Sequence, residues 1–384
     1  MNNINDSAAL VKLILKINEA KIFAFDLEFI PENSFVPYLC LIQVLVEKEI
    51  YIIDPFKIEN LSEFWRLFHD DQITKIVHAG KNDLEIIYGI TNEKAVNIFD
   101  TQVAACFCGY GYQIGLAKLL KDLLSVFISK SQTRSNWSIR PLTTEQLIYA
   151  KNDVKYLFKA YEFLKDKVTE LGRLDWVFQE SVKYDFYYQK KIPQVKNLKV
   201  FASLKQYQLD KLAIERYEFA KVNNLPVKTI ASDDALIEIV ESNANNLNHL
   251  KKISGLSKDF VNQRNQQIIE IISNRKVDLS PWQENVKYFN KEKHLFLNEL
   301  IYFIAKSKAI ELNLPVEFLA SKNDIEKIIF NFLQDKIDSI DCAVLKDWRR
   351  EVIGSDLMAM LKGHTYTISI DNTRLSLELE TNQN

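Results

Sequence analysis

The sequence predicts an α/β domain, built on a mixed sheet flanked by helices, followed by two small all-α domains. Segments with strand and helix periodicity alternate through the first half of the 384 residues, whereas helical periodicity prevails after about Pro193. The helical half also contains an internal repeat, which divides it in two. We therefore expect domains at residues 1–195, 200–278 and 288–364, with a tail or a short hairpin at residues 365–384.

Five segments of the first half are rich in β-branched and aromatic residues, which favours strands at residues 22–29, 39–46, 50–53, 75–78 and 96–99. Helices are predicted at residues 61–68, 83–88 and 101–106. Three strands followed by alternating helix and strand indicate a sheet of mixed direction. A long helical pattern from Thr143 to about Val168 closes this half, with Thr143 or Thr144 as its N-cap.

The helical half repeats one short sequence. NLPVKTIASDDALIEIV, residues 224–240, recurs as NLPVEFLASKNDIEKII, residues 313–329. In each copy Asn-Leu-Pro ends one helix and Ser caps the next, so the repeated unit is a small helical domain. Residues 276–291, which include Pro281, are the expected linker between the two copies. The last residues alternate with a period of two, as strands do, with a turn expected at Asp371 and Asn372.

The composition indicates a globular protein of the reducing cytoplasm. Its four cysteines form neither a disulfide framework nor a paired zinc signature, so we interpret them as core residues. The apolar stretch at residues 8–17 is interrupted by Lys12 and Lys16, and nothing approaches the roughly 20 apolar residues of a membrane span. We expect a monomer that does not associate with membranes.

The formal net charge of −2 hides an uneven distribution of charge. Residues 118–155 hold seven Lys or Arg against three acids, and residues 183–228 hold ten against four. The second stretch is interleaved with Tyr184, Phe186, Tyr187 and Tyr188. Basic groups bind phosphates and aromatic rings stack on bases, so both stretches suit a protein that binds single-stranded nucleic acid. Solvated helix faces with ordinary core aromatics are the alternative for the second stretch.

The most informative segment is KIFAFDLEFI, residues 21–30, an apolar strand that carries Asp26 and Glu28. Side chains two positions apart lie on the same face of a strand, so both acids point in one direction. Two unpaired anions on a buried strand would be costly, and a divalent cation would remove that cost. A charged pair on a solvated face is the alternative.

Two further motifs supply carboxylates. The segment KIVHAGKNDLEIIY predicts a strand that ends near His78 and a helix that begins around Asn82 and Asp83, where an acid is also favoured by the helix dipole alone. In YAKNDVKYL, Tyr149 and Asp153 are four residues apart, so they lie on the same face of a helix. Such a pair also occurs by chance on amphipathic helices.

The order of these motifs resembles the DEDD exonuclease superfamily, in its tyrosine-bearing branch, and within that branch the ribonuclease D family. The resemblance covers nearly the whole chain: FAFDLEF, PYLCLIQV with IYIIDP, ITKIVHAGKNDLEIIY, IFDTQVAACFCG and KSQTRSNWSIRPLTTEQLIYAKNDVKYL. The helical repeats resemble HRDC domains, and the second contains the recurrent phrase LKDWRREVIG. The first repeat lacks the tryptophan often found where IERYEF stands, and the alternating tail lies outside the pattern.

The resemblance implies a ribonuclease H-like exonuclease domain with five site residues, Asp26, Glu28, Asp83, Tyr149 and Asp153. Two Mg²⁺ or Mn²⁺ ions, about 3.5–4 Å apart, would activate water and neutralise the departing 3′ oxygen. Asp26, Glu28 and Asp153 would hold one ion, with Asp26 bridging to a second that Asp83 supports. Tyr149 would orient the water, because a phenol pKa near 10 makes a poor base at neutral pH.

By this resemblance the chain is a 3′-to-5′ exoribonuclease that releases 5′-mononucleotides. Its substrates would be tRNA precursors and other structured RNA with single-stranded 3′ ends, which the HRDC-like domains would bind. At least one of four residues before the last helix, Lys130, Arg134, Trp137 and Arg140, is predicted to contact phosphate or the terminal nucleotide; solvated charges and a packed Trp are the alternative. We interpret His78 as a hydrogen-bonded structural residue. An exonuclease acting on DNA and a non-catalytic nucleic-acid-binding scaffold are the competing functions.

Overall fold

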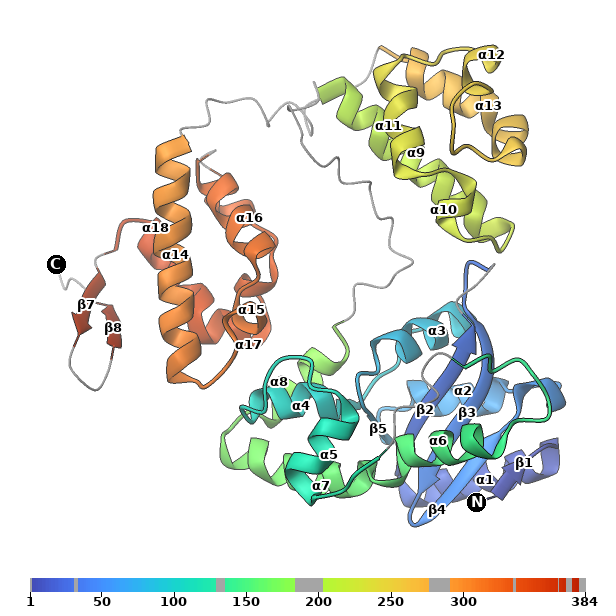
Figure 1. Cartoon of the computed structure of the whole chain (residues 1–384). Helices are drawn as coiled ribbons and strands as arrows, with labels where there is room; N and C mark the ends of the chain where they lie inside the picture. The colour runs from blue at the N-terminus through green and yellow to red at the C-terminus, as the bar shows by residue number, and fades with distance from the viewer. Residues whose placement is uncertain are drawn as a thin grey trace.

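The computed structural model of the chain describes residues 2–30, 34–128, 135–183, 203–275, 291–333, 336–364, 366–370 and 375–379. The predicted linker at residues 276–290, the aromatic cluster at residues 184–188 and the turn at Asp371 and Asn372 lie outside the described residues. Figure 1 shows an α/β part followed by two separate helical units.

The α/β part is built on a six-stranded sheet of order β1-β4-β3-β2-β5-β6. Its strands are β1 (Asn2–Ile4), β2 (Ile22–Ile30), β3 (Tyr38–Val46), β4 (Glu49–Ile53), β5 (Thr74–Val77) and β6 (Ile98–Asp100). Strand β3 pairs antiparallel with β2 and β4, whereas β1–β4, β2–β5 and β5–β6 are parallel pairs. The predicted mixed direction of the sheet is therefore confirmed.

Eight helices belong to the described α/β part: α1 (Ser7–Ala20), α2 (Ser62–His69), α3 (Lys81–Thr91), α4 (Thr101–Phe107), α5 (Leu116–Leu124), α6 (Thr144–Lys155), α7 (Leu157–Glu170) and α8 (Leu174–Ser181). Sequence periodicity missed β1, α1, α5 and α8. The apolar stretch at residues 8–17 is part of α1, which buries Leu10, Leu13 and Ile17. None of the described helices is long and apolar enough to cross a membrane.

The long helix predicted from Thr143 to about Val168 is wrong, because the structure divides it at Tyr156. Tyr156 has φ −108° and ψ 2°, which ends α6 and lets α7 start in a new direction. Helix α6 packs on β2 and β3, whereas α7 packs on α4 and β5. The helical spacing of apolar residues continues across the break, so the sequence pattern gave no sign of it.

The two faces of the sheet have separate cores, and this separation positions the site. Phe23, Phe25 and Leu27 of β2 point to the face covered by α1 and α2. Because strand side chains alternate, Ala24, Asp26 and Glu28 point to the other face, beneath α6. The four cysteines (Cys40, Cys106, Cys108, Cys342) are buried and free, as predicted for core residues.

The two helical units begin with the same helix order. The first contains α9 (Ser203–Val222), α10 (Val227–Ile230), α11 (Asp233–Glu241), α12 (Leu247–Leu250) and α13 (Lys258–Ser273). The second contains α14 (Lys291–Glu311), α15 (Val316–Leu319), α16 (Lys322–Leu333), α17 (Asp347–Arg349) and α18 (Ser355–Leu361), with short 3₁₀ and π turns between α16 and α18. As predicted from the repeat, the hydroxyls of Ser232 and Ser321 accept N–H bonds at the starts of α11 and α16. The alternating tail forms an antiparallel pair, β7 (Tyr366–Ile370) with β8 (Leu375–Leu379).

Candidate active site

Three of the predicted acids converge from β2 and α6. Asp26 and Glu28 lie on β2, and Asp153 lies near the end of α6. One carboxylate oxygen from each lies within 4.8 Å of the other two, so the three could share one metal ion. A register shift in the β2–β3 pairing follows Glu28. The i, i+2 spacing on the strand and the packing of α6 over it together create the cluster.

Asp83 approaches the same cluster from the first turn of α3. It is 6% exposed, and its Oδ1 accepts the backbone N–H of Leu27, between the two acids of β2, at 2.9 Å. Asp83 is not within the three-carboxylate group, but its charge raises the pKa of Asp26, Glu28 and Asp153. It therefore borders the cluster with one oxygen already engaged by the backbone.

Tyr149 lies on α6, one turn before Asp153. Its ring centroid is 5.9 Å from that of Trp137, which is 2% exposed. The start of α6 is fixed by a capping box, in which Thr143 and Gln146 exchange hydrogen bonds between side chain and backbone. The predicted cap at Thr143 is thereby confirmed, and it sets the rotation of the helix that carries Tyr149 and Asp153.

Burial raises the pKa of all four acids, and repulsion from neighbouring site acids adds to the effect at Asp26, Glu28 and Asp153. Desolvation, then the charges of Asp153 and Asp83, raise the pKa of Glu28 to about 9. Desolvation likewise raises the pKa of Asp83 and of Asp153 to about 7 each, and that of Asp26 well above its ordinary value. Within the described residues, the site therefore concentrates carboxylates that lack a positive counter-charge.

The segment before α6 is held by Arg140 through contacts with the sheet. Its guanidinium binds both oxygens of Asp54 at 2.9 Å and donates to the carbonyls of Cys40 and Trp137 at 2.7 Å each. The charge of Arg140 and its hydrogen bonds lower the pKa of Asp54 against the opposing effect of burial.

These contacts favour structural roles for Arg140 and for the packed Trp137. Lys130 and Arg134 lie outside the described residues, so the predicted substrate contact within this set of four stays a prediction.

The turn between β5 and α3 is fixed by Asp100, a residue that sequence reasoning did not single out. The Asp100 carboxylate accepts N–H bonds from Ala79 and Gly80 at 2.9 Å and from Gln102 at 2.8 Å. His78 contacts the hydroxyl of Thr101 at 2.9 Å and the carbonyl of Ile114 at 3.0 Å, so the predicted structural hydrogen bonding is confirmed. Asp100 and His78 together hold the turn from which Asp83 projects.

A fully buried glutamine, Gln43, also belongs to this region and was not among the predicted site residues. It lies on β3 directly opposite Asp26. A single amide within the otherwise apolar strand PYLCLIQV is the sequence signal that could have found it.

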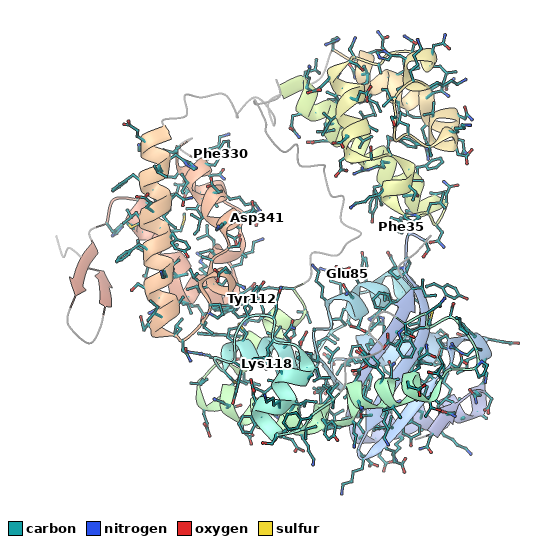
Figure 2. All side chains as sticks on the ribbon, viewed as in Figure 1. Phe35, Glu85, Tyr112, Lys118, Phe330 and Asp341 are labelled. Carbon is teal, nitrogen blue, oxygen red and sulfur yellow. The ribbon has the colours of Figure 1, made fainter. Side chains whose placement is uncertain are left out.

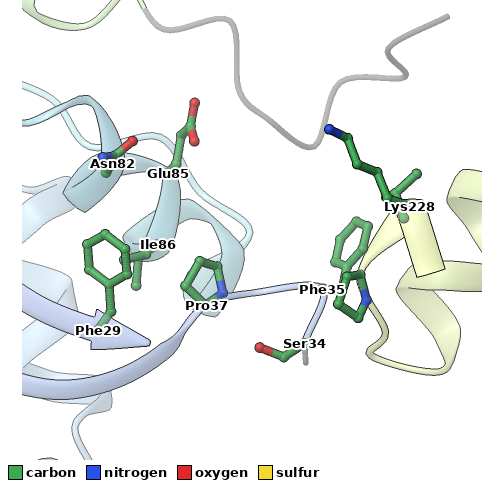
Figure 3. A pocket seen from close by; sticks show the side chains of 10 residues that line it. Phe29, Ser34, Phe35, Pro37, Asn82, Glu85, Ile86 and Lys228 are labelled. Carbon is green, nitrogen blue, oxygen red and sulfur yellow. The ribbon is translucent and has the colours of Figure 1, made fainter. Parts of the chain in front are cut away.

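A cavity of about 450 Å³ lies between the α/β part and the first helical unit. Its walls include Phe29, which follows Glu28, and Asn82, which precedes Asp83. Figure 3 shows Phe29, Ile86 and Pro37 on one side and Phe35 beside the helical unit that carries Lys228. The cavity is therefore mostly apolar, and its described walls do not include the four acids.

Comparison with known proteins agrees with this geometry. A family model described as 3′-5′ exonuclease matches residues 1–169, and one described as HRDC domain matches residues 208–272. Ribonuclease D of Zymomonas mobilis is 30% identical, in an alignment that covers 98% of this chain and 97% of that protein. The chain belongs to the ribonuclease D family. It is thus a 3′-to-5′ exoribonuclease, a hydrolase of phosphodiester bonds.

Two further similarities extend over most of the molecule. Ribonuclease D of a Shewanella species is 29% identical over 92% of this chain and 92% of its own length. The crystal structure of Escherichia coli RNase D, an exoribonuclease involved in structured RNA processing, superposes with a TM-score of 0.78 at 22% identity. That superposition covers 94% of this ribonuclease D chain and 99% of the other, so the two share one fold from the sheet to the helical units.

Proposed function

We propose that this ribonuclease D trims the 3′ ends of tRNA precursors and other structured RNA at the site formed by Asp26, Glu28, Asp83, Tyr149 and Asp153. The observation that carries the assignment is the convergence of Asp26, Glu28 and Asp153, whose ligand oxygens lie within 4.8 Å of one another. A family activity that hydrolyses phosphodiesters needs such a carboxylate cluster for divalent ions.

The residues at this site fit divalent metal ions. Carboxylate oxygens are the donors that Mg²⁺ and Mn²⁺ prefer, and Oδ2 of Asp153 is buried without a hydrogen-bond partner in the described part of the chain. The pKa values of the four acids are raised by the protein around them, and a bound cation would lower these values by stabilising the ionised carboxylates. This is the pattern expected of a site built for a cation. We infer two ions, held by Asp26, Glu28, Asp83 and Asp153. When bound, they supply charge neutralisation and an acidified water.

The side chains divide the remaining work. Tyr149 is one helical turn from Asp153, so its hydroxyl is suited to hold the attacking water in line with the phosphorus. Trp137 packs against the Tyr149 ring and limits its movement. One oxygen of Asp83 accepts the N–H of Leu27, and this contact ties α3 to β2. The other oxygen would be available to the second ion.

We infer that the cavity between the α/β part and the first helical unit receives the unpaired RNA strand. Its aromatic and apolar walls suit the stacking of unpaired bases, which is tolerant of sequence. We infer that the first helical unit, residues 200–278, and the second, residues 288–364, are both HRDC domains that present the 3′ tail. The assignment of the second unit relies on the sequence repeat and on the shared order of its first three helices. We further propose that the enzyme acts in the cytoplasm as a monomer.

Digestion of a 3′-extended, 5′-labelled tRNA precursor tests the assignment. We expect stepwise shortening with Mg²⁺ or Mn²⁺, none with EDTA, and none with Asp153→Asn, which preserves the shape of the side chain. The matched control is Asp166→Asn, at an exposed acid of α7, which should digest RNA as the wild type does. Shortening by Asp153→Asn at the wild-type rate would contradict the site.

A matched DNA strand in the same assay distinguishes the competing functions. Clear preference for DNA would overturn the proposed substrate class. Intact RNA and intact DNA under both metals would favour a binding scaffold instead.

A further inference from the structure

Gln43 occupies a position where the structure offers no local reason for an amide. It is 0% exposed and pairs directly with Asp26 across the antiparallel β2–β3 ladder. Residues directly opposite in such a pair project from the same face, with Cβ atoms about 4.5–5.5 Å apart. The Gln43 side chain therefore shares the face of Asp26 and Glu28, beneath α6. Its neighbours on that face of β3, Leu41 and Leu45, are apolar core residues.

Both polar atoms of this amide are left without a partner. Among the described residues, neither Oε1 nor Nε2 of Gln43 makes a hydrogen bond. Burying a polar group in this way is costly, and native structures rarely leave one unexplained. Two other buried polar atoms near α6, Oδ2 of Asp153 and Nε1 of Trp137, are also unpartnered. A buried glutamine of the first helical unit, Gln208, differs because its Nε2 donates to the carbonyl of Ile272 at 2.9 Å.

We propose that Gln43 is a positioning residue of the metal centre, whose amide N–H groups bind the Asp26 carboxylate and fix its orientation toward the ions. The inference rests on the proposed function, in which Asp26 is a ligand. Carboxylates that bind metals are usually held by an outer hydrogen-bond donor, and an amide provides two N–H donors at this distance.

Gln43→Met, in the full-length protein, separates a positioning role from a structural one. The substitution keeps the length of the side chain and removes the unpartnered polar atoms, so the thermal midpoint in EDTA should rise. Affinity for Mn²⁺, measured by titration calorimetry without RNA, should fall by roughly 10- to 100-fold. The kcat for RNA should fall at subsaturating Mn²⁺, while the KM for RNA stays close to that of the wild type.

The matched control is Gln208→Met, which loses a satisfied hydrogen bond far from the acids. It should lower the thermal midpoint and leave Mn²⁺ affinity unchanged. Wild-type Mn²⁺ affinity in Gln43→Met would overturn the proposal and leave Gln43 as a tolerated core amide.

A crystal structure of the wild-type protein with Mn²⁺ supplies a readout that does not depend on how the variant folds. We expect Nε2 of Gln43 within about 3.2 Å of an Asp26 carboxylate oxygen. A separation beyond hydrogen-bond distance, with the ions in place, would also overturn the proposal. If the wild type bound no Mn²⁺ at all, the proposed function itself would fail, which is a different outcome from unaltered binding by the variant.

Discussion

The two helical units share a sequence repeat, yet they contact the catalytic domain in different ways. The second unit is continuous with the core of that domain: Trp348 stacks on Trp176 at 5.1 Å, and Arg349 forms a buried ion pair with Glu180. The first unit has a core of its own and is contacted by Phe35, whose N–H donates to Asn224 at 3.1 Å and whose ring lies 5.2 Å from that of Tyr217. Figure 2 shows Phe35 at the side of the first unit and Tyr112 at the side of the second.

The difference arises both within the repeated segment and after it. Phe318 of the second copy lies 5.0 Å from the ring of Phe107, whereas Thr229 occupies the corresponding position of the first copy. Trp348 and Arg349 belong to LKDWRREVIG, which follows the second copy, whereas the repeat itself contributes the same asparagine to both contacts. Asn224 accepts the N–H of Phe35, and its counterpart Asn313 lies directly against Gly109, where a Cβ would clash. The repeat therefore places an asparagine at both contacts, and Phe318 together with the Trp–Arg pair extends one of them into a shared core.

Removing the buried ion pair should have the largest effect. Arg349→Ala removes the bidentate partner of Glu180 and leaves it only the Trp348 N–H at 3.1 Å and the Lys183 ammonium at 3.5 Å, so the free energy of unfolding should fall by up to about 3–5 kcal/mol. Urea denaturation measures the loss. The matched control is Arg216→Ala in the first unit. The partner of Arg216, Asp233, is half exposed, so this substitution should lower the free energy of unfolding markedly less. Equal losses would remove the proposed distinction between the two units.

The pH dependence of stability should differ in sign between the interface and the catalytic site. At the interface burial opposes ionisation of Glu180, but Arg349 outweighs it and lowers the pKa. This contribution is present above the unfolded pKa, near 4.3, and is lost as pH falls through the folded value.

At the site the folded pKa values are raised, to about 7 for Asp83 and Asp153 and about 9 for Glu28. Their contribution is present below pH 4 and is lost as pH rises toward 9. Thermal melts in EDTA from pH 3 to 9 should thus show weakening at both ends. Mn²⁺ should restore the alkaline side alone, and restoration of the acid side by Mn²⁺ would contradict this division.

Phe35→Ala should have a smaller effect on the free energy of unfolding and a measurable effect on the KM for RNA. The ring contacts Tyr217 and lines the cavity between the α/β part and the first helical unit, so its loss should cost about 1 kcal/mol and loosen the first unit. We expect the KM for a 3′-extended tRNA precursor to rise several-fold, with kcat for a short oligonucleotide unchanged. Steady-state kinetics on the two substrates measure this, and equal changes on both would argue against a role for the first unit in presenting the RNA.

The effect expected on stability from the asparagine common to both repeats is no larger. Asn224→Ala loses one hydrogen bond to the Phe35 backbone at a residue with φ 48°, which should cost about 1 kcal/mol. Asn313→Ala, at φ 51°, should cost a similar amount because the strain in the backbone is the same. Limited proteolysis should release the first unit in Asn224→Ala and leave the second attached in Asn313→Ala. Release of the second unit by Asn313→Ala would assign its attachment to the repeat after all.

The sequence by itself determined the class of fold and the acids of the proposed site. Spacings of two on a strand and four on a helix are fixed by backbone geometry, so the shared faces of Asp26 with Glu28 and of Tyr149 with Asp153 were predictable locally. The order of strands and helices likewise predicted a mixed sheet, and the repeat predicted two helical units.

Only the tertiary structure decided which partners the remaining residues meet. Arg140 binds Asp54, 86 positions away, and Arg349 binds Glu180, 169 positions away. Neither pair has a local period to reveal it. The break at Tyr156 and the amide of Gln43 beside Asp26 were hidden for the same reason: packing between distant segments, rather than the geometry of one segment, fixes where a helix turns and what a buried side chain faces.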